Sequence, residues 1–124
     1  MSDALTEAFG VVVQPSGHRL DPRSMYDPMR DQYSSRLMLS APLELVPAPD
    51  RVLGVTNVDL FMPILTFVFG EAQLGGRAAL ISTHRLSPTY YGIPPSPPVF
   101  CERAVKEALH ELGHTYGLLH CPDY

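Results

Sequence analysis

The chain has 124 residues, of which 45% are hydrophobic and 18% are charged, so it is long enough for one domain over residues 1–124 with a core of its own. Its net charge is −4, and its nine basic residues are scattered along the sequence, which argues against a nucleic-acid-binding surface. No apolar stretch approaches the roughly 20 residues of a membrane span, and the first residues lack the basic start and apolar core of a signal peptide, so we expect a cytoplasmic protein without a membrane partner.

The first half of the sequence contains one strand candidate and one helix candidate. Val11–Val13 is a short apolar run that ends at the turn residues 14–17. Asp27 and Pro28 then offer a helix N-cap and a first-turn proline. Four apolar residues recur at every fourth position, namely Met25, Met29, Tyr33 and Leu37. This pattern predicts a helix over about residues 28–40, with the methionines packed in the core.

Three strands are predicted in the middle of the chain, after a proline-rich connector. Each is a short run rich in apolar, β-branched or aromatic residues, which is typical of strands. The runs are Arg51–Thr56, Leu65–Gly70 and Ala78–Ser82. Gly75 and Gly76 lie between the second run and the third, where they predict the tip of a hairpin or another close connection.

A long helix is predicted near the end of the sequence, beginning around residues 99–101. Its apolar stripe consists of Val105, Ala108, Leu109, Leu112 and Tyr116. Lys106, His110 and His114 lie on another face, so one side can pack on the sheet while the other presents the histidines. Residues 86–98 hold five of the thirteen prolines and predict a stiff loop beside the cleft, in which Tyr90 and Tyr91 contact either a substrate or the neighbouring surface.

The two cysteines are not expected to pair. A helix between Cys101 and Cys121 would rise about 24 Å, far more than the roughly 7 Å between the Cα atoms of a disulfide. We expect Cys101 to be a small buried apolar residue and His18, which follows a turn glycine, to be a solvated surface residue. His84 follows the third predicted strand, and for it both a surface position and a place beside a functional site stay open.

Residues 110–120 read His-Glu-Leu-Gly-His-Thr-Tyr-Gly-Leu-Leu-His and form the most informative segment of the chain. On a helix, His110 and His114 lie one turn apart on one face, so both imidazoles can bind one metal ion. Glu111 lies about 100° round the helix, beside the metal, where it can act as a general base toward a metal-activated water. An ordinary amphipathic helix would match all the fixed positions only by coincidence, so the metal site is the favoured interpretation.

Gly117 and His120 complete the predicted site. Gly117 permits a positive φ, so the helix can end there and the chain can turn back to deliver His120 as the third ligand. Three protein ligands with one open position are typical of a catalytic zinc ion, whereas structural zinc sites are closed by a fourth ligand. The sequence therefore predicts one catalytic zinc ion held by His110, His114 and His120, with Glu111 as the catalytic base.

Beyond this segment, the sequence resembles the archaemetzincins over roughly residues 24–121. The matching elements are Leu53–Thr56, Asp59-Leu60, Phe67–Ala72, Ser82, Arg85-Leu86, Tyr91-Gly92, Lys106-Glu107 and His120-Cys121. Of these, Phe-Val-Phe-Gly-Glu-Ala and His-Cys are the most specific. The resemblance implies an α/β (α+β) metzincin-like zincin fold, in which a small mixed sheet packs on helices and a C-terminal helix carries the active site.

The resemblance also implies the activity of a zinc-dependent metallopeptidase. Glu111 would take a proton from the zinc-bound water and pass it to the leaving amine. In related metzincins, an extended substrate lies antiparallel to an edge strand above the active-site helix. By resemblance this strand is Thr66–Glu71, and its residues Phe67, Val68, Phe69 and Gly70 would bind a peptide or protein substrate through backbone hydrogen bonds.

The family's pattern continues further than this sequence does. After His-Cys it has a second cysteine followed by the methionine of the Met-turn, and later Cys-x-x-Cys. By resemblance the four cysteines would bind a second, structural zinc ion. Only the first of them, Cys121, is present before the sequence ends at Tyr124, and one thiolate cannot hold a structural zinc, so we expect the catalytic zinc alone. The region before Val11 is also shorter than the family's opening strand and helix.

Two interpretations of these departures stay open. The chain is either a truncated form that lacks the family's C-terminal cysteine-rich segment, or a natural short form that binds zinc through three histidines. The ending Cys-Pro-Asp-Tyr follows the family pattern up to the point where it stops, which favours truncation. The function has a matching alternative, a zinc-binding but inactive homologue that acts as a peptide-binding module or has no function. The sequence indicates neither the preferred peptide nor the oligomeric state.

Overall fold

The main sheet has three strands, and the strand at its centre is the last of them in the sequence. The computed structural model describes residues 19–47, 50–63, 65–94 and 96–117. Strand β3 (Val52–Thr56) lies parallel to β6 (Ala78–Ser82), and β5 (Gly70–Ala72) lies antiparallel to β6 on its other side. The order β3-β6-β5 places β5 at the edge of this sheet.

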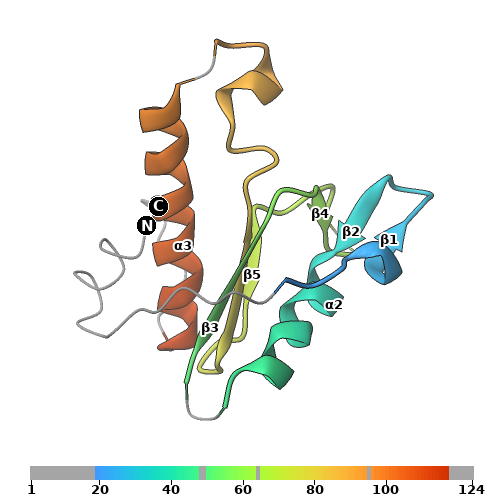
Figure 1. Ribbon diagram of the computed structural model, residues 1–124, viewed down its shortest axis with the longest axis vertical. Helices are drawn as coiled ribbons and strands as arrows, with labels where there is room; N and C mark the ends of the chain where they lie inside the picture. The colour runs from blue at the N-terminus through green and yellow to red at the C-terminus, as the bar shows by residue number, and fades with distance from the viewer. Residues whose placement is uncertain (1–18, 48–49, 64, 95, 118–124) are drawn as a thin grey trace.

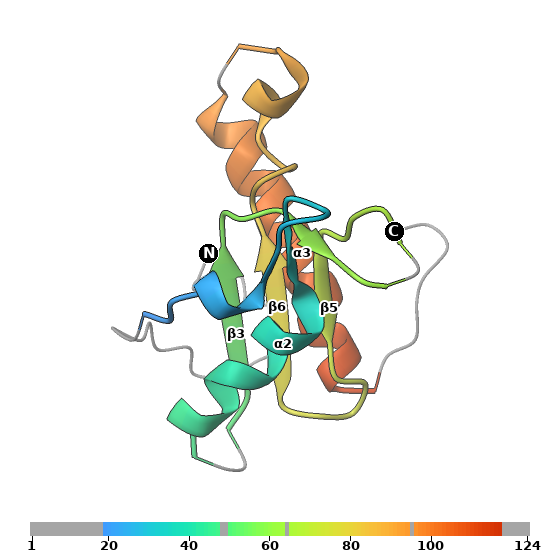
Figure 2. The same ribbon diagram turned by 90° about the vertical axis from the view of Figure 1, so that its right-hand side faces the viewer.

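Helices cover both faces of the sheet, as the two views in Figures 1 and 2 show. The long helix α3 (Pro97–Thr115) packs on one face. Helix α2 (Ser35–Ser40) packs on the other face and runs directly into the 3-10 helix η2 (Ala41–Leu45). This arrangement confirms the predicted α+β class, a small mixed sheet packed on helices with the histidine-bearing helix last in the chain.

Shorter elements extend the structure beside the main sheet. A second, small sheet has the order β1-β2-β4, in which β2 is antiparallel to β1 and parallel to β4. Its strands are β1 (Tyr26–Asp27), β2 (Gln32–Ser34) and β4 (Leu60–Phe61). Two more 3-10 helices, η1 (Arg23–Met25) and η3 (Pro88–Tyr91), lie in the connections.

Strand β6 divides the core between the two helices. All five of its residues are buried, and successive side chains of a strand point to opposite faces. Ala79 and Ile81 pack with Ala108 and Leu112 of α3. Ala78 and Leu80 pack on the other face, in a cluster with Leu39 and Leu60. Alternate side chains of β6 therefore pack against α3 and against α2, and those facing α3 set its distance from the sheet.

The helix predicted over residues 28–40 is wrong in its first half. Residues 26–34 form the β1–β2 hairpin, and α2 begins only at Ser35, with the Ser34 hydroxyl accepting a hydrogen bond from the Leu37 amide. Asp27 caps the hairpin turn rather than a helix, because its carboxylate accepts a hydrogen bond from the Met29 amide at 2.9 Å. Met29 is 93% exposed, so it is not a core residue as predicted.

A residue of unusual backbone conformation closes the same turn. Asp31 has φ 53°, which aspartate tolerates better than most residues, and its carboxylate accepts a 2.6 Å hydrogen bond from the Tyr26 hydroxyl. The Tyr26 and Tyr33 rings lie 5.0 Å apart across the hairpin. The apolar residues whose spacing predicted one helix therefore belong partly to the hairpin and partly to the short helix α2.

The three predicted strands of the main sheet are confirmed in two cases and displaced in the third. Residues 52–56 and 78–82 form β3 and β6, close to the predicted ranges. The strand predicted over Leu65–Gly70 instead begins at Gly70 and runs to Ala72, while Val68 makes only an isolated antiparallel bridge to Leu60. The predicted connection at Gly75 is confirmed, with φ 67° in the β5–β6 turn.

Helix α3 follows the prediction at its C-terminal end and departs from it elsewhere. It begins at Pro97, slightly earlier than expected, and Gly117 has the positive φ of 85° that was predicted for its end. Cys101, in the first part of α3, is exposed and not buried as predicted. Tyr116 is 41% exposed and lies under the Arg51 guanidinium instead of joining the apolar stripe.

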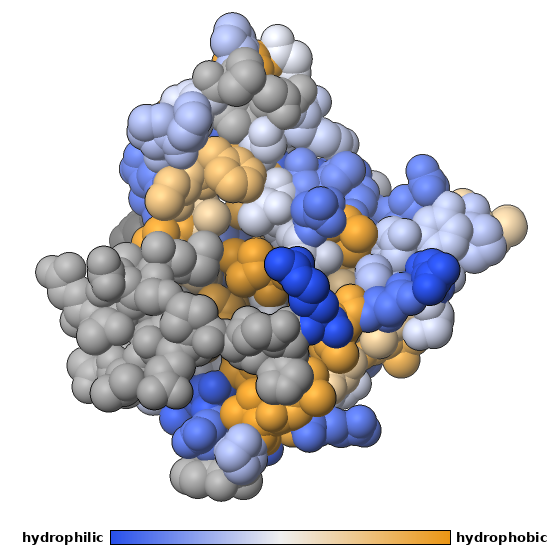
Figure 3. Space-filling model, in the orientation of Figure 1, coloured by the Kyte–Doolittle hydropathy of each residue, from blue (hydrophilic) through white to orange (hydrophobic). Residues whose placement is uncertain are grey.

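Exposed apolar side chains are distributed over several elements. Met29 lies in the β1–β2 turn, Val55 on β3 and Leu74 in the β5–β6 turn. On the face shown in Figure 3, apolar residues lie in groups with hydrophilic residues between them. Among the described residues, no helix combines the length and apolar character needed to cross a bilayer.

Candidate metal centre

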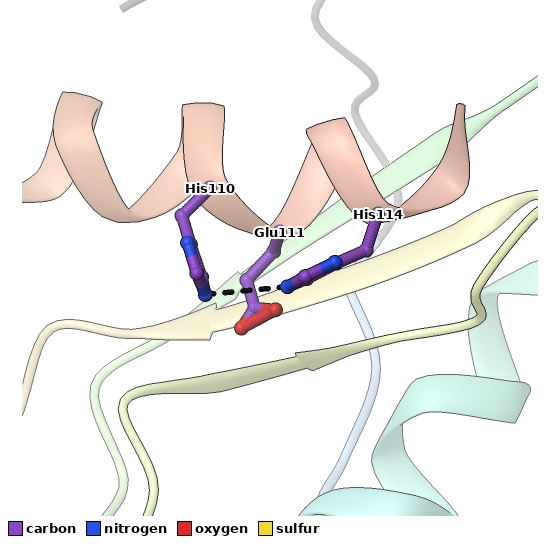
Figure 4. A group of neighbouring side chains, drawn as sticks. All are labelled: His110, Glu111 and His114. Atoms are coloured by element: carbon purple, nitrogen blue, oxygen red, sulfur yellow. Dashed lines mark hydrogen bonds between the residues drawn. The ribbon is translucent and has the colours of Figure 1, made fainter. Parts of the chain in front are cut away.

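Helix α3 brings together three side chains that can bind a metal ion. The ligand atoms of His110, Glu111 and His114 all lie within 4.8 Å of one another. Figure 4 shows the three side chains extending from α3 on the side of the strands, with the Glu111 carboxylate next to both imidazoles. Within the part of the chain that the structure describes, no other group of histidine, cysteine or acidic side chains meets at this spacing.

The spacing of the two histidines fits a tetrahedral zinc ion. Two nitrogen ligands at the usual zinc–nitrogen distance of about 2.0–2.1 Å, separated by a tetrahedral angle, lie about 3.3–3.4 Å apart. His110 Nε2 and His114 Nε2 are 3.3 Å apart, and their rings meet edge to face. This distance also allows one imidazole to donate a hydrogen bond to the other, as the dashed line in Figure 4 marks. The pair is thus already placed for a shared zinc ion.

Glu111 is the most enclosed of the three side chains. It is only 5% exposed, and it faces the backbone of Gly70 on β5. Burial raises the pKa of the Glu111 carboxyl to about 8, and the negative charges of Glu107 and Glu71 add to the effect. A cation held by the two histidines would favour the ionised carboxylate and so lower this pKa. Metal binding would therefore favour the deprotonated carboxylate, the form of Glu111 that can accept a proton.

Glu107 lies one helical turn before Glu111 and forms a carboxyl pair with it. Burial raises the pKa of Glu107 as well, while its hydrogen bond with Glu111 and the charge of His114 oppose that rise. Because the two carboxyl groups are hydrogen-bonded to each other, they titrate as a pair and not independently. Glu107 was identified in the sequence only as a residue matching the archaemetzincins.

The end of α3 is held in place next to the site. The His114 carbonyl accepts hydrogen bonds from the amides of Gly117 at 2.9 Å and Gly75 at 2.8 Å. Arg51, directly before β3, donates to the Thr115 hydroxyl at 3.1 Å, and its guanidinium lies 3.8 Å from the centre of the Tyr116 ring. The helix turn that carries His114 is therefore anchored to the sheet from two sides.

Two predicted site residues, one predicted strand and one other histidine fall outside the part of the chain that the structure describes. His120, the predicted third ligand, and Cys121, the predicted remnant of a structural zinc site, lie outside the described residues, as do Val11–Val13 and His18. His84 takes no part in the metal-binding group: its Nδ1 lies 3.2 Å from the Asn57 carbonyl and its ring contacts Tyr90.

The segment that leads into β5 is supported by a polar network that the sequence did not predict. Arg85 donates to both carboxylate oxygens of Asp59, at 2.8 and 2.9 Å, and its guanidinium lies 4.0 Å from the centre of the Phe67 ring. Gln32 donates to Asp59 and to the Thr66 carbonyl. Burial raises the pKa of Asp59, but its hydrogen bonds with Arg85 and Gln32 outweigh this and hold it below the usual value. The network fixes the path of residues 66–67 toward the edge strand.

Comparison with known proteins decides the family. Residues 23–124 match Peptidase family M54. The chain belongs to peptidase family M54. It is 50% identical over 98 residues to the archaemetzincin of Methanocaldococcus jannaschii, an alignment that covers 79% of this chain and 53% of that protein. This M54 chain therefore spans about half the length of such relatives.

Solved structures of M54-related proteins share the fold described above. The crystal structure of archaemetzincin from Methanopyrus kandleri is similar with a TM-score of 0.85 and 41% identity, over 98% of this chain and 64% of that one. A zinc-dependent peptidase from Methanocorpusculum labreanum is similar with a TM-score of 0.82 and 29% identity, over 98% of this chain and 75% of that one. The metzincin-like fold expected from the sequence is thereby confirmed for this M54 chain.

Proposed function

We propose that this chain carries the catalytic site of a zinc-dependent metallopeptidase that hydrolyses peptide bonds. The observation that carries the proposal is the pair of imidazole nitrogens 3.3 Å apart with the buried Glu111 carboxyl beside them. His110 and His114 would hold the ion, and His120 would be the third protein ligand. When bound, zinc would supply Lewis-acid polarisation of the scissile carbonyl and lower the pKa of a coordinated water.

Glu111 would carry the proton during hydrolysis. One of its Oε atoms lies within 4.8 Å of the ligand nitrogens of both histidines, beside the space in which the attacking water would sit. One Oε would accept the proton of that water during attack and then donate it to the nitrogen of the leaving amine. Because the carboxyl is almost fully buried, its proton affinity depends strongly on the charges near it, which suits a group that both takes and gives a proton.

The edge strand β5 would bind the substrate as an added antiparallel strand. Phe69 and Gln73 direct their backbone groups to β6, where they bond to Ser82 and Ala78. By the alternation of a strand, Gly70 and Ala72 direct theirs to the opposite edge. Val68 also faces that edge, but its amide bonds to the Leu60 carbonyl at 3.1 Å. Within the predicted strand Phe67–Gly70, the substrate would therefore pair at Gly70 and continue toward Ala72.

Peptide cleavage by the wild type and by Glu111→Gln tests the proposal. The glutamine keeps the size of the side chain but cannot accept the proton, so cleavage of a peptide library should fall by about 100-fold to 10,000-fold at equal zinc content. Glu102→Gln is the matched control, because Glu102 lies exposed on the same helix and pairs with Lys106 at the surface. This control should cleave at the wild-type rate.

The outcomes separate the proposed activity from its alternative. Equal cleavage by the wild type and Glu111→Gln would contradict the role of Glu111. If all three proteins bind zinc but none cleaves the peptides, the alternative of a peptide-binding module is favoured. Binding of the same peptides by the zinc-loaded chain would then establish that alternative.

A further inference from the structure

We propose that Gly70 is a positioning residue for Glu111, because the absence of a side chain at this point of the edge strand leaves the space that the carboxylate occupies. The proposal rests on the proposed function, in which Glu111 acts on the substrate. It assigns a physical role to the glycine of the Phe-Val-Phe-Gly-Glu-Ala segment.

There is no room for a side chain between the two residues. A β-carbon added to Gly70 would lie 2.8 Å from Glu111 Oε2 and 3.0 Å from Glu111 Cγ. It would also collide with the carbonyl oxygen of Leu80 on β6. Gly70 is not among the described glycines with positive φ, which are Gly75, Gly92 and Gly117. Space, and not backbone conformation, therefore requires glycine here.

Neither partner can move away easily. The Phe69 carbonyl accepts a hydrogen bond from the Ser82 amide at 2.8 Å, and the Glu71 carboxylate accepts one from the Ser35 hydroxyl at 2.8 Å. These bonds hold β5 on both sides of Gly70. On the helix side, the fully buried Ala108 fixes the distance of α3 from the sheet. An added methyl group must therefore displace the carboxylate of Glu111 or part the strands.

The contact sets the base relative to the substrate. Gly70 is the residue of β5 at which the substrate would first pair, and the carboxylate that would carry the proton occupies the space that a side chain at Gly70 would need. One backbone position thus aligns the peptide and the base. A displacement of about 1 Å in such an arrangement can cost about 100-fold in rate.

Gly70→Ala tests this role, with Gly54→Ala as the matched control. Gly54 lies on β3, and a β-carbon there would meet first the end of the flexible Leu80 side chain, at 3.2 Å. We expect Gly70→Ala to bind zinc with the wild-type stoichiometry but to lose about 100-fold in kcat and to shift the pH profile of cleavage. Gly54→Ala should keep kcat within about twofold. Wild-type kcat and pH profile in Gly70→Ala would overturn the proposal.

A double-mutant cycle on the metal-free protein tests the contact without any activity. The thermal midpoint is measured for the wild type, Gly70→Ala, Glu111→Ala and the double variant. Glu111→Ala removes both Glu111 atoms that the methyl group would meet. If the contact with Glu111 matters, the loss caused by Gly70→Ala should be smaller by about 3 °C or more when Glu111 is absent. Folding only in the double variant would be the extreme form of this result.

The same cycle distinguishes failure of this proposal from failure of the proposed function. An equal loss of midpoint in both backgrounds, or failure to fold in both, would show that the Leu80 carbonyl alone excludes a side chain, and would overturn the role assigned to Gly70. Coupling in the cycle combined with an inactive wild type would leave the Gly70–Glu111 contact standing and contradict only the peptidase activity.

Discussion

The two faces of strand β6 are built from different kinds of residues. Toward α3, the buried core is made of Ala79, Ile81, Ala108 and Leu112. Toward α2, it contains three leucines, Leu39, Leu60 and Leu80, with Ala78. The small residues Ala79 and Ala108 let α3 lie close to the sheet, so that Glu111 lies next to Gly70. The leucines on the other face bury more apolar surface.

The candidate site and the larger apolar cluster lie on opposite sides of one strand. On the α3 face, buried polar groups such as Glu111 and Thr115 replace apolar side chains. On the α2 face, several partly buried apolar residues surround the central cluster, among them Tyr33, Met38, Leu43, Val52, Val58 and Val68. Substitutions on the two faces should therefore separate stability from metal binding.

The largest effect on stability is expected from Leu60→Ala. Leu60 is fully buried in the α2-side cluster, so the cavity should lower the free energy of unfolding by about 2–5 kcal/mol. Urea unfolding of the metal-free protein measures this, and Leu74→Ala, at a 61% exposed position, is the control with a change of about 0.5 kcal/mol or less. A folded Leu60→Ala variant should still bind zinc. A loss no larger than that of the control would contradict the assignment of the main core to this face.

A smaller effect is expected from Arg51→Met, which removes the tie between the start of β3 and the end of α3. The loss of the hydrogen bond to Thr115 and of the contact with the Tyr116 ring should cost about 1–2 kcal/mol in unfolding free energy. Arg23→Met is the control, because Arg23 pairs with Asp21 in full exposure to solvent. If both variants unfold at the same urea concentration, the helix end is not held by Arg51.

A pH dependence of stability is expected as well, and only in the metal-free protein. Folded Glu111 holds its proton up to a pH near 8, whereas its ordinary pKa is 4.5, so the stability gained from the protonated group is complete below the ordinary pKa and is lost as the pH rises through about 8. Thermal midpoints should thus fall between about pH 5 and about pH 9. The fall should be weaker in Glu111→Gln, and zinc should also weaken it by favouring the ionised carboxylate. A midpoint that falls equally in all three samples would contradict burial of the Glu111 proton.

The parts of the molecule that the sequence predicted well are those determined by local pattern. The end of α3 follows from the positive φ of Gly117, and the spacing of His110, Glu111 and His114 on one helix brings their side chains together. Strands β3 and β6 follow from short apolar runs. In each case the residues that decide the structure lie within a few positions of one another.

The parts that the sequence did not predict are determined by contacts between distant segments. Residues 32–34 form a strand because β2 pairs with β4, and the Tyr33 amide donates to the Asp59 carbonyl. The apolar run over 65–69 is not a continuous strand, since Phe67 lies against Arg85 and Val68 pairs with Leu60. The need for glycine at position 70 arises from the Leu80 carbonyl and the Glu111 side chain, which no local pattern reveals.

Elemental analysis of the purified chain and of His114→Ala tests the central claim most directly. The account predicts about one zinc ion per wild-type chain purified without chelators, and loss of that zinc in His114→Ala while the metal-free variant keeps its thermal midpoint within a few degrees. His120→Ala should lose affinity too if His120 is the third ligand. Stoichiometric zinc retained by His114→Ala would contradict the account, because the ion would then be held somewhere other than the face of α3 on which His110 and His114 meet.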